Sequence, residues 1–455
     1  MKPTVSARVS VGLVLVALCG AAVGMDVSPA AGPGVPPARR VPADPIPASL
    51  PDSVYWRLTT ELSEPGGEFP YDNFVSNESA FEDVLPQLQA TAQPGGAYIG
   101  VGPEQNFSYI AAMRPRIAFV VDIRRAAAIQ HLLCKALFEL SPDRAEFVSR
   151  LFSRPRPAAL STAPANARPE AMFEAYASEP GDRALFDRNL AAVETLLLKT
   201  HGFTLSPADL STLTRLYDAF YRYGPDITYA GSGGPFATFR QMAVVADSGG
   251  VQRGFLANEA NYQIVRDLQR RNLVVFVVGD FAGPKALRAI GDYLRAHGAL
   301  VNAFYTSNVE QWLFTPDNTW RQFYANVATL PMDSTSVFVR ATPTPAIALS
   351  TDASYARTVR VPPAPDPPVF HDALARLGIP SRRLPCTTPP APRIVLDSVR
   401  QADGAVRVVR RPGFRVGPGA GYGDLAVCLA SMSDVVRAFE AGLIDRYSQV
   451  IAIAR

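Results

Sequence analysis

The sequence is poor in cysteine and histidine, with four of each in 455 residues. Cys134, Cys386 and Cys428 lie beyond residue 24, and none belongs to a Cys-x-x-Cys pair. A disulfide framework and a structural zinc site are therefore not indicated, although the pattern leaves one distant disulfide open. The histidines are isolated and form no metal-binding pair on a helix, so the sequence predicts no metal site. They are His131, His201, His297 and His371.

Runs of like charge are also missing. The formal net charge is +3, and lysine and arginine are scattered along the chain. Such a distribution provides no basic surface for the phosphates of a nucleic acid. A nucleic-acid partner is therefore not expected.

Long apolar runs are confined to the start of the chain. Lys2 and Arg8 precede an apolar run from residue 11 to 23 that ends in small residues, as in a secretory signal. The sequence predicts a signal peptide over residues 1–24 and an exported protein, which is periplasmic, in the cell envelope or secreted. Lipid anchoring at Cys19 is less favoured because the bulky Leu18 precedes it, and a retained, uncleaved signal segment is a further alternative.

Composition divides the remaining chain into segments of different character. Proline and alanine dominate two of them, and the 48% hydrophobic residues of the whole chain suffice for a large core. We expect a flexible linker over 25–52, an α/β domain over 53–341 with a helical insertion at about 141–261, a proline-rich linker over 342–393, and a small C-terminal unit over 394–455. In this last unit, residues 425–443 are amphipathic.

Short apolar runs alternate with helical periodicity within residues 53–341. The strand-like runs are 97–101, 117–123, 273–278 and 300–305. Continuous apolar strands of this kind are typical of a parallel sheet covered on both faces. The fold class predicted is α/β, with a doubly wound, mostly parallel sheet.

A glycine turn follows the first of these strands. Gly100 and Gly102 lie where the strand turns, and Asp122 ends the next strand, 22 residues beyond Gly100. Two glycines and an acid at this spacing are typical of an adenosine-type crevice in which the carboxylate binds the ribose hydroxyls. The third glycine of the dinucleotide motif is missing, which favours S-adenosylmethionine over a pyrophosphate cofactor. The alternative is a tight turn in which Asp122 only caps the helix that starts near Arg124.

Polar residues follow the glycines and the later strands. Three of them, Glu104, Gln105 and Asn106, are predicted to meet the amino-acid tail of the same ligand. Asp280 is the candidate general base at one strand end, and Tyr305 and Asn308 at the next are candidates to orient a substrate nucleophile.

A polar group precedes the α/β pattern. It consists of Asp72, Asn73, Asn77 and Glu78. These residues are predicted to cover the ligand or contact the substrate. The alternative is a polar loop that leads into a capped helix.

Four segments carry a resemblance to a known family. They are Glu64-Pro-Gly-Gly-Glu-Phe-Pro-Tyr-Asp-Asn-Phe-Val-Ser-Asn-Glu78, Tyr98-Ile-Gly-Val-Gly-Pro-Glu-Gln-Asn-Phe107, Ser307-Asn-Val-Glu-Gln311 and Asn326-Val-Ala-Thr-Leu-Pro331. Together they resemble an uncharacterised bacterial family with a methyltransferase-like Rossmann fold, over roughly residues 53–340. The resemblance implies that fold and an S-adenosylmethionine pocket, and it implies no established reaction.

Two functional hypotheses follow, and a third is weaker. One is an S-adenosylmethionine-dependent methyltransferase that acts on an unknown small molecule or protein, although export would separate it from a donor made in the cytoplasm. The other is a noncatalytic envelope protein that keeps the Rossmann scaffold for binding or interaction. A hydrolase ranks last because the sequence has no Gly-x-Ser-x-Gly motif.

Overall fold

The structure is a computed structural model of the whole chain. It describes residues 45–160, 167–232, 236–314, 318–343, 368–381, 396–400, 406–410 and 425–453. The predicted signal peptide and most of the predicted linkers lie outside these residues.

A six-stranded sheet forms the centre of the protein, in the order β3-β2-β1-β4-β5-β8. Its strands are β1 (Ala97–Gly100), β2 (Ile117–Asp122), β3 (Val274–Val278), β4 (Val301–Ser307), β5 (Val337–Pro343) and β8 (Leu425–Ser431). The first five are parallel, and β8 pairs antiparallel with β5. The predicted α/β fold with a mostly parallel, Rossmann-like sheet is therefore confirmed.

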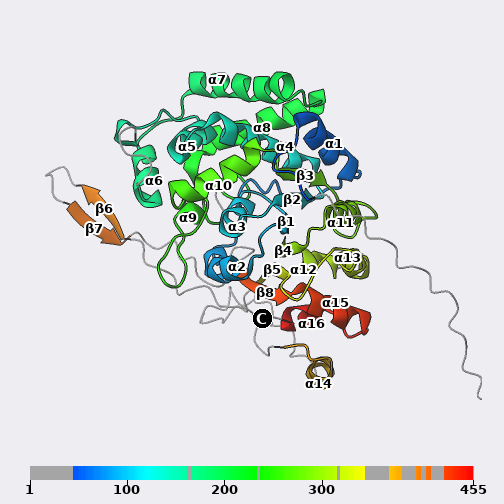
Figure 1. Ribbon diagram of the computed structural model, residues 1–455. Helices are drawn as coiled ribbons and strands as arrows, with labels where there is room; N and C mark the ends of the chain where they lie inside the picture. The colour runs from blue at the N-terminus through cyan, green and yellow to red at the C-terminus, as the bar shows by residue number, and fades with distance from the viewer. Residues whose placement is uncertain are drawn as a thin grey trace, which may run out of the picture. The chain divides into compact units, whose positions relative to one another are not determined.

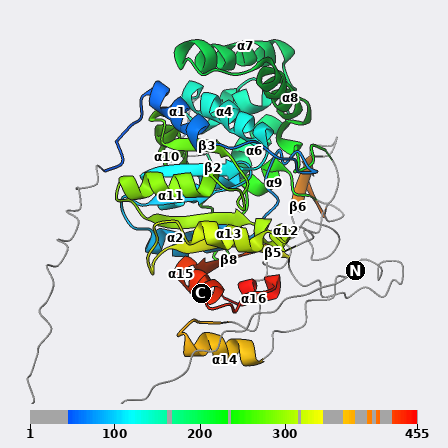
Figure 2. The same cartoon turned by 90° about the vertical axis from the view of Figure 1, so that its right-hand side faces the viewer.

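Helices cover both faces of the sheet (Figures 1 and 2). One face carries α2 (Leu85–Thr91), α3 (Gln105–Met113), α4 (Arg125–Leu140) and α10 (Glu259–Arg270). The other carries α1 (Asp52–Leu62), α11 (Ala286–Ala296), α12 (Val309–Leu313) and α13 (Trp320–Val327). All residues of β1, β2 and β3 are buried, as expected for strands covered on both sides.

A group of helices lies between α4 and α10 along the chain. They are α5 (Arg144–Phe152), α6 (Pro169–Ala177), α7 (Arg183–Glu194), α8 (Pro207–Tyr223) and α9 (Phe239–Ala243). Shorter turns are η1 (Phe81–Val84), η2 (Ala158–Leu160), a π-helix η3 (Thr195–Thr200) and η4 (Gly224–Asp226). Ser206 caps α8 with a reciprocal bond to Asp209, and Pro207 fits the first helical position because an amide there would have no acceptor within the helix. These helices lie within residues 141–261, the interval for which the sequence predicted a helical insertion.

The C-terminal residues 425–453 are continuous with the main sheet. β8 pairs with β5 from Val337–Ser431 to Pro343–Leu425, and α15 (Met432–Glu440) and α16 (Tyr447–Ala452) follow it. The described residues before β8 form α14 (Pro368–Arg376) and a hairpin of β6 (Leu396–Arg400) and β7 (Val406–Arg410). The first seven residues of the predicted amphipathic stretch form a strand because their apolar side chains are buried against the sheet.

A buried ion pair joins this C-terminal part to the rest of the domain. Arg340 of β5 donates to both carboxylate oxygens of Glu310, at 2.6 and 3.0 Å, and each side chain is only 1% exposed. The same guanidinium donates to the carbonyls of Val450 and Ile453. Tyr324 donates a further bond to Glu310. Charges buried this deeply require such partners.

Candidate functional site

Residues 63–78 lie across the carboxyl ends of four strands, and we call them the covering segment. At the end of β3, the Glu64 amide donates to the Val278 carbonyl at 2.9 Å. The Glu64 carboxylate accepts from the amides of Asp280 and Lys285 at 2.9 and 3.0 Å. At the end of β2, the Gly67 amide donates to the Ile123 carbonyl at 2.8 Å.

The second half of the covering segment reaches β1 and β4. The Ser76 amide donates to Glu104, which follows β1, at 3.0 Å. The Glu78 carboxylate accepts from Ser307, the last residue of β4. In a doubly wound sheet this edge is where ligands bind. The covering segment therefore lies over the edge at which sheets of this type bind ligands.

Glycines allow this segment to lie close to the strands. A Cβ at Gly67 would come within 2.7 Å of the Ile123 side chain, and one at Gly66 within 3.2 Å of the Ile123 carbonyl. The motif Glu64-Pro-Gly-Gly67 is thus explained by close packing on the sheet edge.

Glu78 is the centre of a buried polar cluster at the ends of β1 and β4. It is 1% exposed, and its carboxylate accepts from Gln105 at 3.0 Å as well as from Ser307 and Tyr305. Gln105 also donates to the Tyr109 hydroxyl at 2.8 Å. Burial raises the pKa of the Glu78 carboxyl, and the hydrogen bonds from Ser307, Tyr305 and Gln105 oppose this effect.

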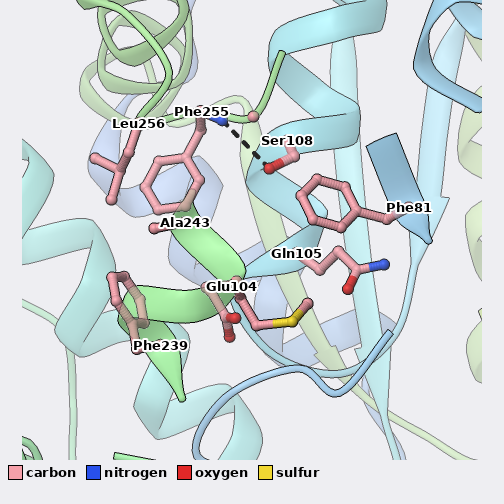
Figure 3. Close-up of a pocket in the computed structure, with 10 residues that line it drawn as sticks. Phe81, Glu104, Gln105, Ser108, Phe239, Ala243, Phe255 and Leu256 are labelled. Atoms are coloured by element: carbon pink, nitrogen blue, oxygen red, sulfur yellow. Dashed lines mark hydrogen bonds between the residues drawn. The ribbon is translucent and has the colours of Figure 1, made fainter. Parts of the chain in front are cut away.

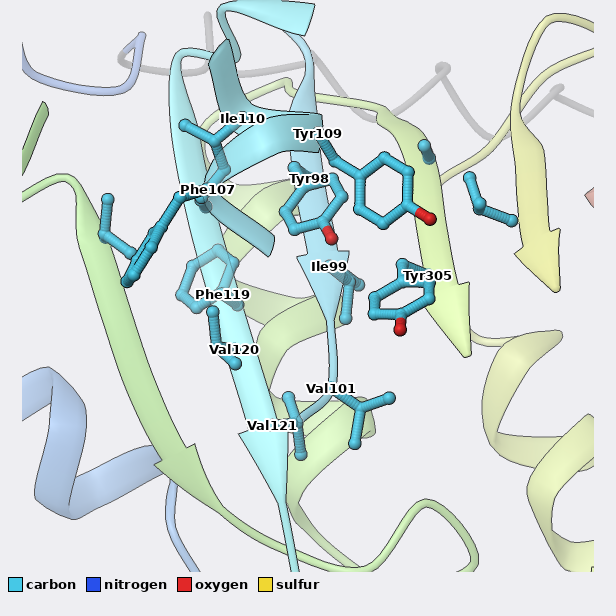
Figure 4. Packing of buried hydrophobic residues seen from close by; sticks show 14 of the residues in the cluster. Tyr98, Ile99, Val101, Phe107, Tyr109, Ile110, Phe119, Val120, Val121 and Tyr305 are labelled. Atoms are coloured by element: carbon cyan, nitrogen blue, oxygen red, sulfur yellow. The ribbon is translucent and has the colours of Figure 1, made fainter. Parts of the chain in front are cut away.

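Three tyrosines pack around this cluster (Figure 4). The rings of Tyr109 and Tyr305 are 4.7 Å apart, and those of Tyr98 and Tyr109 are 6.3 Å apart. Ser307 has a left-handed backbone, with φ at 51°, where the pairing of β4 with β5 is irregular. Strained residues of this kind tend to occur at functional sites.

The glycine turn after β1 is filled from inside by Asn106. This side chain is fully buried, accepts from the Tyr98 hydroxyl at 2.8 Å, and donates to the carbonyls of Val101, Gly102 and Pro103. A Cβ at Gly100 would come within 2.0 Å of the Asn106 oxygen. Gly102, with φ at 75°, has open space on its Cβ side. Asn106 therefore stabilises the turn and is not directed at a ligand.

His131 of α4 also stabilises the glycine turn, through a hydrogen bond to its backbone. Its Nε2 lies 2.8 Å from the Gly102 carbonyl, and its ring stacks on Phe276. Burial lowers the pKa of His131 to about 4, so the ring is neutral and donates this bond.

Asp122 is paired with Arg124. One carboxylate oxygen accepts from the Arg124 amide at 2.9 Å and from Nε at 3.1 Å, and the other accepts from the guanidinium at 3.1 Å. Arg124 also donates to the carbonyls of Tyr71 and Asp72 in the covering segment. The Asp122 carboxylate, which was predicted to hold a ribose, therefore bonds the residue that precedes α4. Through Arg124 it is also connected to the covering segment.

The three candidate catalytic residues do not form one group. Asp280 lies at the end of β3, where its carboxylate accepts from the Ala282 amide at 2.9 Å. Tyr305 is buried in β4, and Asn308 precedes α12. Because β2 and β1 separate β3 from β4, the two strand ends are roughly 14 Å apart at the usual strand spacing.

The other residues of the predicted covering group have different surroundings. Asp72 is exposed and pairs with Arg215 of α8 at 3.1 Å. Asn73 has a left-handed backbone with φ at 52°, and Asn77 is half-buried. Of the predicted site residues, the structure brings together Glu78, Gln105 and Tyr305. Sequence reasoning missed Ser307, Arg124 and His131, of which only Arg124, two residues after Asp122, had a local signal.

Small cavities adjoin Glu104 at the start of α3 (Figure 3). One has a volume of about 20 Å³ and a second about 10 Å³. Pockets for drug-sized ligands are typically on the order of 300 Å³ or larger. Within the described residues, no cluster of His, Cys, Asp and Glu could hold a metal ion.

The fold is that of a Rossmann-like α/β protein whose strand ends are covered by residues 63–78. Residues 73–362, more than half of the chain, match the family described as a domain of unknown function, DUF7790. The chain belongs to this family, in agreement with the uncharacterised family expected from the sequence. No curated protein matches the sequence.

Proposed function

We propose that this chain is an exported binding or interaction protein that keeps a Rossmann-like scaffold and does not transfer methyl groups. The observation that carries the proposal is the course of the covering segment, which bonds at the ends of β3, β2, β1 and β4. Ligands of doubly wound sheets bind at that edge. Here the protein's own carboxylates and amides take the positions that a ligand would need.

S-adenosylmethionine does not fit the residues expected to hold it in this conformation. Both oxygens of Asp122 are bonded to Arg124, and Asn106 fills the glycine turn. The cavity beside the turn, at about 20 Å³, has room for one or two water molecules. No reaction step through this donor is therefore derived.

Two features support the exported location. Cys428 in β8 is disulfide-bonded, and structural disulfides are typical of proteins outside the cytoplasm. The charged and apolar pattern of residues 1–24 is that of a secretory signal. Among the described helices, none is both long and apolar enough to cross a bilayer.

Calorimetric titration of the purified chain with S-adenosylmethionine and S-adenosylhomocysteine tests the proposal. A folded sample should give no binding at micromolar concentrations, because the covering segment competes with the ligand. Micromolar binding by the wild-type chain would overturn the noncatalytic proposal.

A methyltransferase is the second candidate, and the sheet supports it. Asp122 ends the strand next to β1, and Gly102 faces open space, as an adenosyl ligand would require. The antiparallel β8 also departs from the all-parallel dinucleotide-binding order. In this candidate the covering segment must move away before the ligand binds.

The variant Glu64→Ala separates the two candidates because it removes two bonds that hold the covering segment. If the methyltransferase candidate is right, the variant gains affinity for S-adenosylmethionine. Asp122→Ala in the same background should then weaken binding by about 1–3 kcal/mol, as when a buried hydrogen-bond partner is lost. Unchanged absence of binding supports the noncatalytic scaffold.

A further inference from the structure

An aromatic cavity lies beside the N-terminus of α3, between that helix and the helical segment that precedes α10 (Figure 3). Its apolar walls are Phe81, Phe239, Met242, Phe255 and Leu256. Three elements far apart in the sequence, η1, α9 and the loop before α10, thus contribute to one lining. The carboxyl group of Glu104 is the acidic part of the lining.

Glu104 lacks a counter-charge. Its carboxylate accepts from backbone amides only, from Ser76 at 3.0 and 3.1 Å and from its own residue. Among the described residues, no lysine or arginine forms an ion pair with it, and the charged group acting on it is the like-charged Glu78. Burial raises the pKa of Glu104 to about 7. A carboxylate in this position would be stabilised by a cation.

We propose that this cavity binds the ammonium group of a small amine. Aromatic ring faces attract cations, and Phe81, Phe239 and Phe255 surround the cavity. The Glu104 carboxylate supplies the opposite charge. An anionic ligand would be repelled by that carboxylate, and a neutral apolar ligand would leave it without a counter-charge. The inference goes beyond the proposed function and does not depend on it.

The size of the cavity limits the ligand. A volume of about 20 Å³ admits a head group of one or two heavy atoms, since one water needs roughly 10–15 Å³. Methylammonium meets this limit, and tetramethylammonium does not. Partly exposed Ala243 and Gly254 form the rim, through which the remainder of a longer amine would extend. Met242 has an unbranched, adaptable side chain that can adjust to the head group.

Titration of the intact chain with methylammonium chloride at pH 8 tests the proposal, with sodium chloride as the salt control and methanol as the neutral probe of similar size. Methylammonium should give a saturable rise in melting temperature that neither control gives. Affinity should fall about tenfold between pH 8 and pH 6, because a proton then competes for Glu104, whose pKa is about 7. Two other titratable groups interact electrostatically with Glu104. Glu78 raises the pKa of Glu104, and Glu104 raises the pKa of Cys134.

Three variants complete the test. Glu104→Gln removes the charge and should weaken binding at least about tenfold. Ala243→Leu fills the rim without touching the acid and should also abolish binding, which keeps the test decisive if Glu104→Gln fails to fold. Glu61→Gln, on the exposed face of α1, is the matched control and should bind as the wild type does. Equal stabilisation by methanol, no saturable binding, or full binding by Ala243→Leu would overturn the proposal.

Discussion

Arg124 connects the end of β2 to the covering segment, which lies about 50 residues earlier in the chain. Its guanidinium bonds Asp122 at the end of β2 and two carbonyls of the covering segment. Both members of the ion pair have side chains 9% exposed. Each charge is therefore largely removed from water and depends on the other.

Replacement of Arg124 should consequently be costly. Arg124→Ala leaves Asp122 buried without its partner, and we expect a loss of about 3–5 kcal/mol in the free energy of unfolding. Urea denaturation measures this loss. Arg114→Ala is the control, because Arg114 is exposed at the end of α3. If Arg124→Ala lost no more unfolding free energy than Arg114→Ala, the ion pair of Arg124 with Asp122 would contribute little to stability.

Glu104 should make the stability of the protein depend on pH. Its pKa of about 7 in the folded state lies above its usual value of 4.5. The stability linked to its protonation is therefore complete below pH 4.5 and is lost as pH rises through 7. Glu104→Gln should reduce the fall in unfolding free energy between pH 5 and pH 7.5. An unchanged pH profile would contradict this.

Glu82 should also contribute to the dependence of the unfolding free energy on pH. Burial raises its pKa to about 8, and its carboxylate accepts from the amides of Arg253 and Gly254. A decline of stability up to pH 8 should therefore remain in Glu104→Gln.

At the scale of elements, the covering segment offers a matched pair of acids. Glu64 bonds two backbone amides, whereas Glu68, four residues later, is exposed. Glu64→Ala leaves those amides without their acceptor and should cost about 1–3 kcal/mol. Limited proteolysis should then cut residues 63–78 faster than in the wild type, and Glu68→Ala should not change the rate. Equal rates in the two variants would show that Glu64 does not hold the segment.

Helix α1 is held by a histidine between two acids. His201 has one ring nitrogen 2.9 Å from Asp52 of α1 and the other 3.0 Å from Glu139 of α4. Two ionised acceptors require both nitrogens to carry protons. Burial lowers the pKa of His201, but the bonds to Glu139 and Asp52 outweigh burial and raise it above 6.5.

The interactions of His201 with Asp52 of α1 and Glu139 of α4 should therefore weaken at high pH. The stability from a histidine with a raised pKa is complete below about pH 6.5 and is lost as pH rises through the folded-state pKa. We expect His201→Gln to cost more unfolding free energy at pH 6 than at pH 8.5, with a difference of about 1 kcal/mol. The buried Lys135 beside Glu139 keeps its charge partner at both pH values. An equal cost at both pH values would assign the effect to lost stacking on Phe203.

The sequence predicted four of the strands because each is an apolar run between helices. β5 was missed because Arg340 interrupts its apolar pattern, and β8 because α15 follows it directly. Asp280 and Tyr305 were grouped because their strands are successive in the chain. The crossover from β3 to β4 passes two intervening strands, which local sequence cannot show. Side-chain pairs such as Glu78 with Ser307, which are far apart in the chain, likewise depend on the folded geometry.

At the scale of the whole molecule, β8 protects the edge of the parallel sheet. It bonds β5 along seven residue pairs. Deletion of residues 425–455 would expose the β5 edge and leave Arg340 without two of its carbonyl acceptors. We expect this truncated chain to aggregate, because an unpaired edge strand pairs with other chains. A soluble, monomeric truncation in size-exclusion chromatography would contradict the expectation.

The position of β8 also affects when the protein can fold. β8 starts at residue 425, and its partner β5 ends at residue 343. Contacts over such sequence distances form slowly and only after both partners are present. During synthesis the sheet lacks its edge strand until residues 425–431 have left the ribosome. For the proposed export, this delay would keep the chain unfolded long enough to be threaded through a translocation channel.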